Sequence, residues 1–260
     1  MELPIYQVDA FASKVFAGNP AAVCPLNEWL PDATLQSIAL ENNLSETAFF
    51  VRTNGRYQLR WFTPGCEVDL CGHATLASAY VLFSELGEPG TAIRFDTQSG
   101  ELVVTRQGDR LTLNFPARPP ASVTVHSALK AALGGPEPLE VLGARDYLVR
   151  YATEDHVRSL SPNMEALKTI DRFAVIVTAP GVDCDFVSRF FAPAKGVNED
   201  PVTGSAHCTL IPYWASKLNQ NTLYARQISP RGGELFCELQ GNRVEIGGSA
   251  VPFLKGTIYI

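Results

Sequence analysis

Two stretches of the chain are apolar around almost their whole circumference when they are drawn as helices. They run from His73 to Leu86 and from Ser205 to Leu218, and each opens directly after a glycine. A helix that is apolar on every face has to be buried on every face. Because the neighbouring segments are short and strand-like, we expect sheet to surround each helix.

Short apolar runs bounded by turn residues predict the strands. An ordinary amphipathic helix is predicted between Asp32 and Asn43. Pro212 falls inside the second apolar stretch, so that helix is expected to kink or to begin a new segment there. The predicted strands are Pro4–Ala10, Ala21–Leu26, Thr47–Arg52, Gln58–Phe62, Ile93–Asp96 and Phe173–Thr178.

The sequence also repeats itself. GELVVTRQGDRLTLNF (Gly100–Phe115) aligns without a gap with GELFCELQGNRVEIGG (Gly233–Gly248), and each predicts a hairpin around a Gly-Asp or Gly-Asn turn. Upstream, at nearly the same offset, Glu67–Gly72 aligns with Glu199–Gly204. Two segments that agree in order and offset indicate a duplicated unit.

We therefore predict an α/β (α+β) fold of two pseudo-symmetric repeats, each a curved, mostly antiparallel sheet around a central buried helix. The repeats are expected to cover residues 1–115 and 121–260, with an active-site cleft between them. Pro116–Pro120 is proline-rich and is the predicted linker.

Composition and residue spacing exclude several kinds of partner and cofactor. The net charge is -6 and no Lys/Arg cluster stands out, so neither nucleic acid nor an anionic membrane surface is expected as a partner. No signal peptide or membrane-spanning run is recognised. The six cysteines and four histidines show no disulfide or metal-ligand spacing, and no nucleotide-binding glycine motif occurs. We expect a cytoplasmic protein without a metal or cofactor.

The two helix starts are candidate carboxylate sites. Gly72 with His73, and Gly204 with Ser205, would present free backbone N–H groups at the positive end of a helix dipole. If the repeats pack around a pseudo-twofold axis, both starts can face one cleft and bind a small carboxylate. The alternative is that each glycine only permits close packing of helix on sheet.

Candidate acid–base groups lie near these starts. Glu46 falls between a predicted helix and strand, where apolar neighbours make a carboxylate a stronger base; alternatively it is a turn or capping residue. Asp200 precedes the second helix and is a candidate or a cap. His73 opens the first helix, whose dipole would lower the imidazole pKa and favour the neutral form; a structural role is the alternative. His207, inside the second helix, is predicted to be structural.

Cys71 directly precedes Gly72, where a helix start could lower the pKa of a thiol. A racemase with two thiols would need a counterpart at Thr203, and that position carries no cysteine. Cys71 is therefore predicted to pack against the core or to line the substrate site rather than to act as a nucleophile.

Four motifs, in order along the chain, resemble the phenazine-biosynthesis (PhzF-like) isomerase family. They are VDAFASKVFAGNPAAVCPL (Val8–Leu26), NLSETAFF (Asn43–Phe50), FTPGCEVDLCGHATLASA (Phe62–Ala79) and GVNEDPVTGSAH (Gly196–His207). The resemblance implies the diaminopimelate epimerase fold, which has two pseudo-symmetric halves. The best-known member isomerises a dihydro-hydroxyanthranilate without metal or cofactor, and members are commonly homodimers.

The resemblance also implies roles for individual residues. It implies that Glu46 is the catalytic acid/base. It also implies that Gly72 and His73 contact the substrate at the first helix start, and that Asp200, Gly204 and Ser205 contact it at the second. The chain departs from the phenazine-pathway pattern in Asp–Leu–Cys before Gly72 and in Pro201. These departures leave the substrate open.

The expected function is a cofactor-independent isomerase that moves a carbon-bound proton on a small amino- or hydroxy-carboxylate. One alternative is a thiol-based epimerase or racemase of amino acids. A second alternative is a non-catalytic protein that binds small carboxylates.

Overall fold

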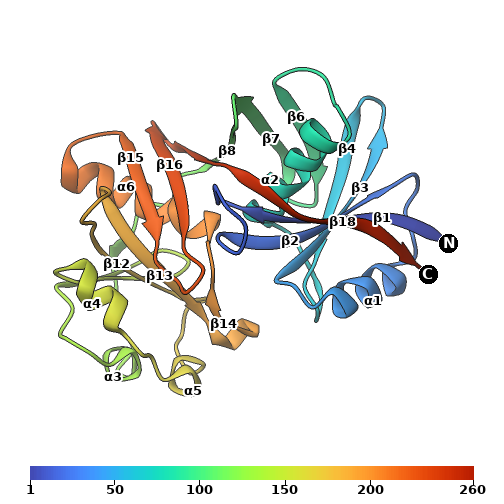
Figure 1. The fold of residues 1–260 in the computed structure, drawn as a ribbon. Coiled ribbons are helices and arrows are strands. Elements are labelled where there is room, and N and C mark those ends of the chain that lie inside the picture. Colours follow the sequence, from blue (N-terminus) through green and yellow to red (C-terminus); the bar gives the residue numbers. More distant parts are fainter. The chain divides into compact units, whose positions relative to one another are not determined.

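The computed structural model describes residues 1–260, which divide into two compact units. Met1–Asn114 and Gly247–Ile260 form the first unit, and Phe115–Ile246 forms the second. The boundary expected for the second repeat at residue 260 is thus corrected to Ile246. The physical reason is that β18 (Ala250–Tyr259) pairs antiparallel with β1 (Glu2–Ala10), which returns the C-terminal segment to the first unit (Figure 1).

The first unit is built on one mostly antiparallel sheet. Its strands lie in the order β18-β1-β2-β3-β4-β6-β7-β8, with β5 beside β4, and only the β2–β3 and β4–β6 pairs are parallel. The further strands are β2 (Asn19–Leu26), β3 (Glu46–Thr53), β4 (Arg56–Phe62), β5 (Glu67–Val68), β6 (Ala92–Thr97), β7 (Gly100–Gln107) and β8 (Arg110–Pro116).

Two helices pack on this sheet. Helix α1 (Asp32–Asn42) packs against Ala22, Cys24 and Phe49, so the predicted amphipathic helix is confirmed. Helix α2 (Gly72–Tyr80) lies along β1, β2 and β3 and continues as a π-helical turn, η1 (Val81–Glu85). Every residue of α2 from position 73 to 79 is buried, as the all-round apolar pattern predicted.

The second unit has its own sheet, in the order β9-β10-β11-β12-β13-β15-β16, with β14 beside β13. Its strands are β9 (Ala121–Ser122), β10 (Glu140–Gly143), β11 (Tyr147–Arg150), β12 (Val175–Pro180), β13 (Phe186–Ala192), β14 (Val197–Asp200), β15 (Thr222–Gln227), β16 (Gly233–Gln240) and β17 (Arg243–Gly248). Its helices are α3 (Leu129–Leu133), α4 (Glu154–Ser159), α5 (Met164–Leu167), η2 (Pro193–Lys195) and α6 (Gly204–Leu218).

The two units share one topology, which confirms the duplication. Strands β1 to β7 correspond in order and direction to β10 to β16: in each unit only the second–third and fourth–sixth strand pairs are parallel. The buried helices α2 and α6 both connect the fifth strand of a repeat to the sixth. The hairpin glycines also match, since Gly108 and Gly241 have φ of 61° and 62°, a conformation that glycine adopts without strain.

An ion pair is duplicated with the fold. Arg60 on β4 binds Glu67 on β5 through Nε–Oε1 at 2.7 Å and Nη2–Oε2 at 2.8 Å. Arg189 on β13 binds Glu199 on β14 through the same atoms at 2.7 and 2.9 Å. Bidentate Arg–carboxylate pairs fix geometry as well as adding energy. Each pair therefore holds the short strand that leads into the buried helix.

Helix α6 does not restart at Pro212, although the sequence predicted a kink or a new segment there. Proline has no N–H, so the carbonyl of Cys208, one turn earlier, loses its intrahelical donor. The backbone N–H of Arg118, in the proline-rich linker, donates to that carbonyl at 2.8 Å. A replacement donor allows the helix to continue to Leu218. No helix in the structure is both long and apolar enough to cross a membrane.

Candidate active site

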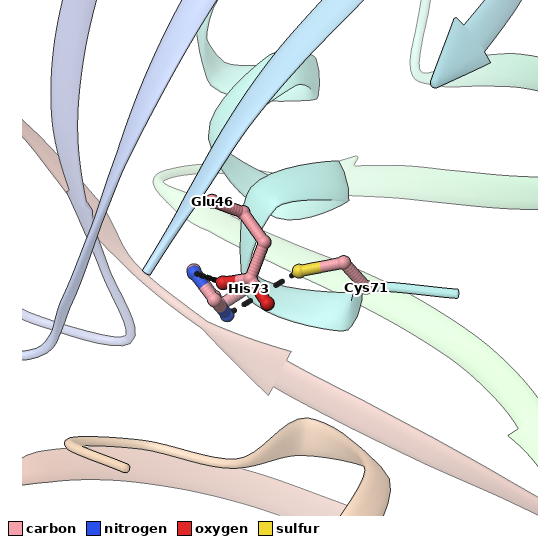
Figure 2. Close-up of side chains that lie close together, drawn as sticks. All are labelled: Glu46, Cys71 and His73. Atoms are coloured by element: carbon pink, nitrogen blue, oxygen red, sulfur yellow. Dashed lines mark hydrogen bonds and ion pairs between the residues drawn. The ribbon is translucent and has the colours of Figure 1, made fainter. Parts of the chain in front are cut away.

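Glu46, Cys71 and His73 meet at the start of α2 in the first unit (Figure 2). The Nε2 atom of His73 lies 3.2 Å from Oε2 of Glu46, and its Nδ1 atom lies 3.5 Å from Sγ of Cys71. His73 and Cys71 are buried, whereas Glu46 keeps part of its side chain exposed. The structure thus brings together two residues predicted as catalytic and the thiol whose role was open.

Local structure explains why the three side chains converge. Parallel pairing of β2 with β3 aligns Ala21 with Glu46, which places the carboxylate on the first residue of β3. The β5 strand then leads into α2, whose first turn carries His73. Asn19, the first residue of β2, is fully buried and its Nδ2 atom lies 3.2 Å from His73 Nδ1.

Asn19 decides how the neutral imidazole is protonated. The amide nitrogen of Asn19 donates to Nδ1 of His73, so the ring proton of the neutral form sits on Nε2 and faces Glu46. If the ring takes a second proton, Nδ1 becomes a donor and Cys71 Sγ is the neighbouring acceptor. His73 can therefore hold a proton beside the Glu46 carboxylate in either state.

The protonation expected for His73 has to be corrected. Burial lowers the pKa of His73, but the charges of Cys71 and Glu46 raise it by more, so its pKa lies well above the usual 6.5. The helix dipole had been expected to lower this pKa. A carboxylate 3.2 Å from Nε2 stabilises the imidazolium more than the helix start disfavours it.

The pKa of Cys71 also shifts in the direction opposite to the one expected. Burial raises the pKa of its thiol above the usual 9.0, and the Glu46 carboxylate raises it further, although His73 acts in the opposite sense. A helix start lowers a thiol pKa only where the thiolate is solvated or paired. The direction of this shift makes the thiolate of Cys71 harder to form than that of an ordinary cysteine, which argues against a nucleophilic role.

The donor atoms of Glu46, Cys71 and His73 lie within 4.8 Å of one another, and this is the one group of three side chains with the spacing of a metal site. Its geometry favours a hydrogen-bonded cluster instead. Glu46 faces Nε2 of the imidazole and Cys71 faces Nδ1, so the two residues approach opposite sides of the ring. One metal ion bound to a single ring nitrogen cannot replace both contacts.

The residues predicted in the second repeat form a polar group within the second unit. Asp200 ends β14, Gly204 opens α6 and Ser205 follows it. The hydroxyl of Thr203 donates to Asp200 Oδ2, and Gln227 donates from Nε2 to the Asp200 carbonyl at 2.7 Å. Asp200 is half-buried and hydrogen-bonded, so it acts at least as part of the turn that positions the start of α6.

His207 is a structural residue, as the sequence predicted. Its Nδ1–H donates to the Thr203 carbonyl at 2.9 Å, and its side chain is fully buried. Burial lowers the pKa of His207 to about 4, against a smaller opposing effect of the Thr203 carbonyl. The imidazole is therefore neutral at physiological pH.

Strand register shows which site residues are duplicated. Arg60 pairs with Phe49 in β3 and Arg189 pairs with Val177 in β12. Counting back three residues from each partner gives Glu46 in the first repeat and Ala174 in the second. The second repeat thus has no carboxylate at the Glu46 position.

Sequence reasoning missed two polar neighbours of the helix starts. Asn19 lies in the quoted Val8–Leu26 motif but received no role, and Arg145, which contacts Ser205, lies in no quoted motif. The Gly-Asn-Pro at the start of β2 was the available signal for Asn19. No local signal pointed to Arg145.

The duplicated fold recurs in a solved structure of low sequence identity. A hydroxyproline epimerase structure from Agrobacterium vitis, with bound trans-4-hydroxy-L-proline, has the same fold: its TM-score is 0.62 at 12% identity, over 99% of this chain and 92% of that one. The two-repeat, diaminopimelate-epimerase-like architecture predicted from the sequence is thereby confirmed.

The family follows from closer comparisons. The family model "Phenazine biosynthesis-like protein" matches residues 8–256. An uncharacterized isomerase of Pseudomonas aeruginosa is 54% identical over 99% of both chains. A crystal structure of a PhzF family protein from Enterococcus faecalis is 51% identical, covers 100% of both chains and has a TM-score of 0.98. The chain belongs to the phenazine biosynthesis-like (PhzF) family, as its motifs indicated.

Proposed function

We propose that this protein is an isomerase that moves a carbon-bound proton on a small amino- or hydroxy-carboxylate, with a reaction similar to that of dihydro-hydroxyanthranilate isomerase. The contact of Glu46 with His73 carries the proposal, because it places a carboxylate base beside a group that can hold a proton. Names of relatives as isomerases support the same class.

In the proposed reaction the substrate carboxylate binds at Gly204 and Ser205 and at the start of α2, where Gly72 and His73 lie. The Glu46 carboxylate removes a proton from an activated carbon, and the electron pair of the broken C–H bond moves into the conjugated system. Glu46 then returns the proton to another carbon on the same face. His73 and Asp200 hold the polar substituents, and no cofactor takes part.

The register of the repeats supports a single base. Inversion of a stereocentre normally uses two bases on opposite faces, whereas migration of a proton along one face needs only one. Ala174 stands in the second repeat where Glu46 stands in the first, and Thr203 stands where Cys71 does. The duplicated scaffold therefore carries one copy of this base.

One observation favours a second candidate, a thiol-based epimerase or racemase. Cys71 Sγ lies 3.5 Å from His73 Nδ1, within reach of a proton acceptor. The raised pKa of its thiol argues against it as the working base. The third candidate, a protein that binds carboxylates without catalysis, has no observation in its favour.

The decisive experiment is solvent deuterium incorporation. The protein is incubated in heavy water with a panel of amino- and hydroxy-carboxylates that includes a dihydro-hydroxyanthranilate, with and without EDTA, and carbon-bound label is followed by NMR and mass spectrometry. We expect exchange that falls by about 10²- to 10⁴-fold in Glu46→Gln and is unchanged by EDTA. Exchange that survives in Glu46→Gln but is lost in Cys71→Ser would establish the thiol mechanism instead.

We also propose that the protein is a cytoplasmic homodimer. All six cysteines are unpaired, which agrees with a reducing compartment. Strand β18 exposes Phe253, Leu254 and Tyr259, a long apolar edge that proteins usually cover. Light scattering after gel filtration tests the dimer, and a monomeric mass at micromolar concentration would refute it.

A further inference from the structure

Arg145 lies just before β11 and is held rigidly in the second unit. Its Nε and Nη2 atoms donate to Asp146 Oδ1 and Oδ2, each at 3.1 Å, and Asp146 is fully buried. A buried carboxylate that lost its cation would be strongly destabilised, so the pair stays formed. The guanidinium also stacks on Phe173, with its carbon 4.4 Å from the ring centroid.

The same guanidinium reaches the start of α6. Its Nη2 atom donates to Ser205 Oγ at 3.2 Å. The bonds to Asp146 and Ser205 occupy Nε and Nη2 and leave the two N–H groups of Nη1 without a partner in the protein. One third of the Arg145 side chain is exposed, so the residue can be reached from solvent.

The first unit has a comparable contact at the start of its own buried helix. There, Asn19 at the start of β2 contacts His73, the residue after the glycine that opens α2. In the second unit, Arg145, two residues before β11, contacts Ser205, the residue after the glycine that opens α6. Strands β2 and β11 are equivalent in the duplicated topology. Through the register of the paired strands Cys24 is equivalent to Val149, so Arg145 lies one position beyond the equivalent of Asn19. In both units, nevertheless, the segment that opens the second strand of the repeat contacts the residue after the helix-opening glycine.

We propose that Arg145 is a substrate-binding residue that holds the substrate carboxylate through its Nη1 N–H groups, next to Ser205. The proposal rests on the proposed function in one respect, the role of Ser205 as a substrate contact. Asp146 balances the charge of Arg145, so the guanidinium acts through direct, charge-assisted hydrogen bonds rather than long-range attraction. The consequence is a preference for carboxylates over carboxamides of the same shape.

Anthranilate and its amide, anthranilamide, are a matched pair of fluorescent probes for this preference. Each is titrated against the wild-type protein and against Arg145→Met and Arg145→Lys. We expect anthranilate to bind the wild type at least about tenfold tighter than anthranilamide, and Arg145→Met to lose that preference, since a hydrogen bond to a charged group contributes about 10- to 100-fold. Arg145→Lys keeps the positive charge but not the planar set of N–H donors, and should therefore keep part of the preference for the carboxylate.

Removal of Arg145 alone leaves Asp146 buried without its cation and can destabilise the fold. The double variant Arg145→Met/Asp146→Asn removes both charges and is therefore measured beside the single variant. Arg158→Met, which removes an exposed arginine on α4, is the matched control and should bind both probes like the wild type. Melting curves show which variants fold.

Two results would overturn the proposal. One is an unchanged carboxylate preference in a folded Arg145 variant, and the other is a wild-type protein that binds neither probe or binds both equally. Neither result depends on catalysis. Failure of the proposed function appears separately, as absence of Glu46-dependent deuterium exchange in a protein whose probe binding still requires Arg145.

Discussion

Acid should destabilise this protein through a single buried imidazole, His207. Its pKa is about 4 in the folded chain because burial disfavours the charged ring, against a usual value of 6.5. The folded state therefore resists protonation that the unfolded state accepts. Stability is fully present above pH 6.5, is lost as the pH falls from 6.5 to about 4, and changes no further through this group below that.

The size of the effect follows from the two pKa values. A difference of about 2.5 pH units at about 1.4 kcal/mol each gives about 3 kcal/mol of lost unfolding free energy. Because the ring is fully buried, solvent does not screen this free-energy difference. The hydrogen bond from Nδ1 to the Thr203 carbonyl is kept in both charge states, so the cost arises from burying the charge at the unpartnered Nε2 side.

Urea unfolding at pH 7.5, 6.5, 5.5 and 4.5, followed by circular dichroism, measures this loss. His207→Gln keeps a donor for the Thr203 carbonyl and cannot be protonated. Packing should make the variant less stable than the wild type at pH 7.5, but its unfolding free energy should fall by about 3 kcal/mol less on acidification. His156→Gln, at a half-buried position in α4, is the control for replacement of a histidine by glutamine.

The reasoning would be refuted if His207→Gln and the wild type lost stability in parallel between pH 6.5 and 4.5. It would also be refuted if the wild type lost its stability only below pH 4, because His207 would then not be the group that titrates. Since the protein has two units, the transition should be followed with a second probe, tryptophan fluorescence, to check that both report one cooperative event.

Three further predictions concern the site and its support. Cys71→Ala should keep deuterium exchange within about tenfold of the wild type while Glu46→Gln loses at least about a hundredfold; loss in both variants would give the thiol a chemical role. Asn19→Asp places a carboxylate beside His73 Nδ1 and should protonate the ring, visible as an imidazolium signal in ¹⁵N-histidine NMR at a pH where the wild type is neutral; an unchanged titration would contradict it. Arg189→Lys loses the bidentate fork to its carboxylate and should lower the unfolding free energy by about 1–3 kcal/mol, measured by urea titration, whereas no change would show that a single charge suffices.

The elements that sequence reasoning predicted are those with local signals. Helix α1, the buried helices α2 and α6, and the turn glycines Gly108 and Gly241 all follow from patterns within a short window. The pairing of β18 with β1 did not, because it joins the two ends of the chain. Continuity of α6 through Pro212 was also out of reach, since it depends on a donor nearly a hundred residues away.

The sequence identified two members of the cluster at the start of α2 but not the electrostatics of that cluster. Glu46 and His73 were both identified, and both lie in one cluster. The helix dipole predicts a lowered pKa for both His73 and Cys71, whereas both pKa values are raised. The dipole depends only on the helix that carries the residue. Burial and Glu46 raise the pKa of Cys71, whereas Cys71 and Glu46 raise the pKa of His73 against the effect of burial. Such a neighbour is visible only once the strands are paired.

The two repeats share some contacts that stabilise the fold and differ at residues that the fold does not require. Where both repeats keep the same contact, as in the Arg–Glu pairs before α2 and α6, the contact serves a fold that was built twice. Where equivalent positions differ, a duplicated structural need cannot explain the residue. Two pairs of equivalent positions differ in this way: Glu46 against Ala174, and His73 against Ser205. The proposed base and the proposed proton holder thus belong to the first repeat alone, whereas a symmetric two-base racemase would be expected to keep the same groups in both repeats.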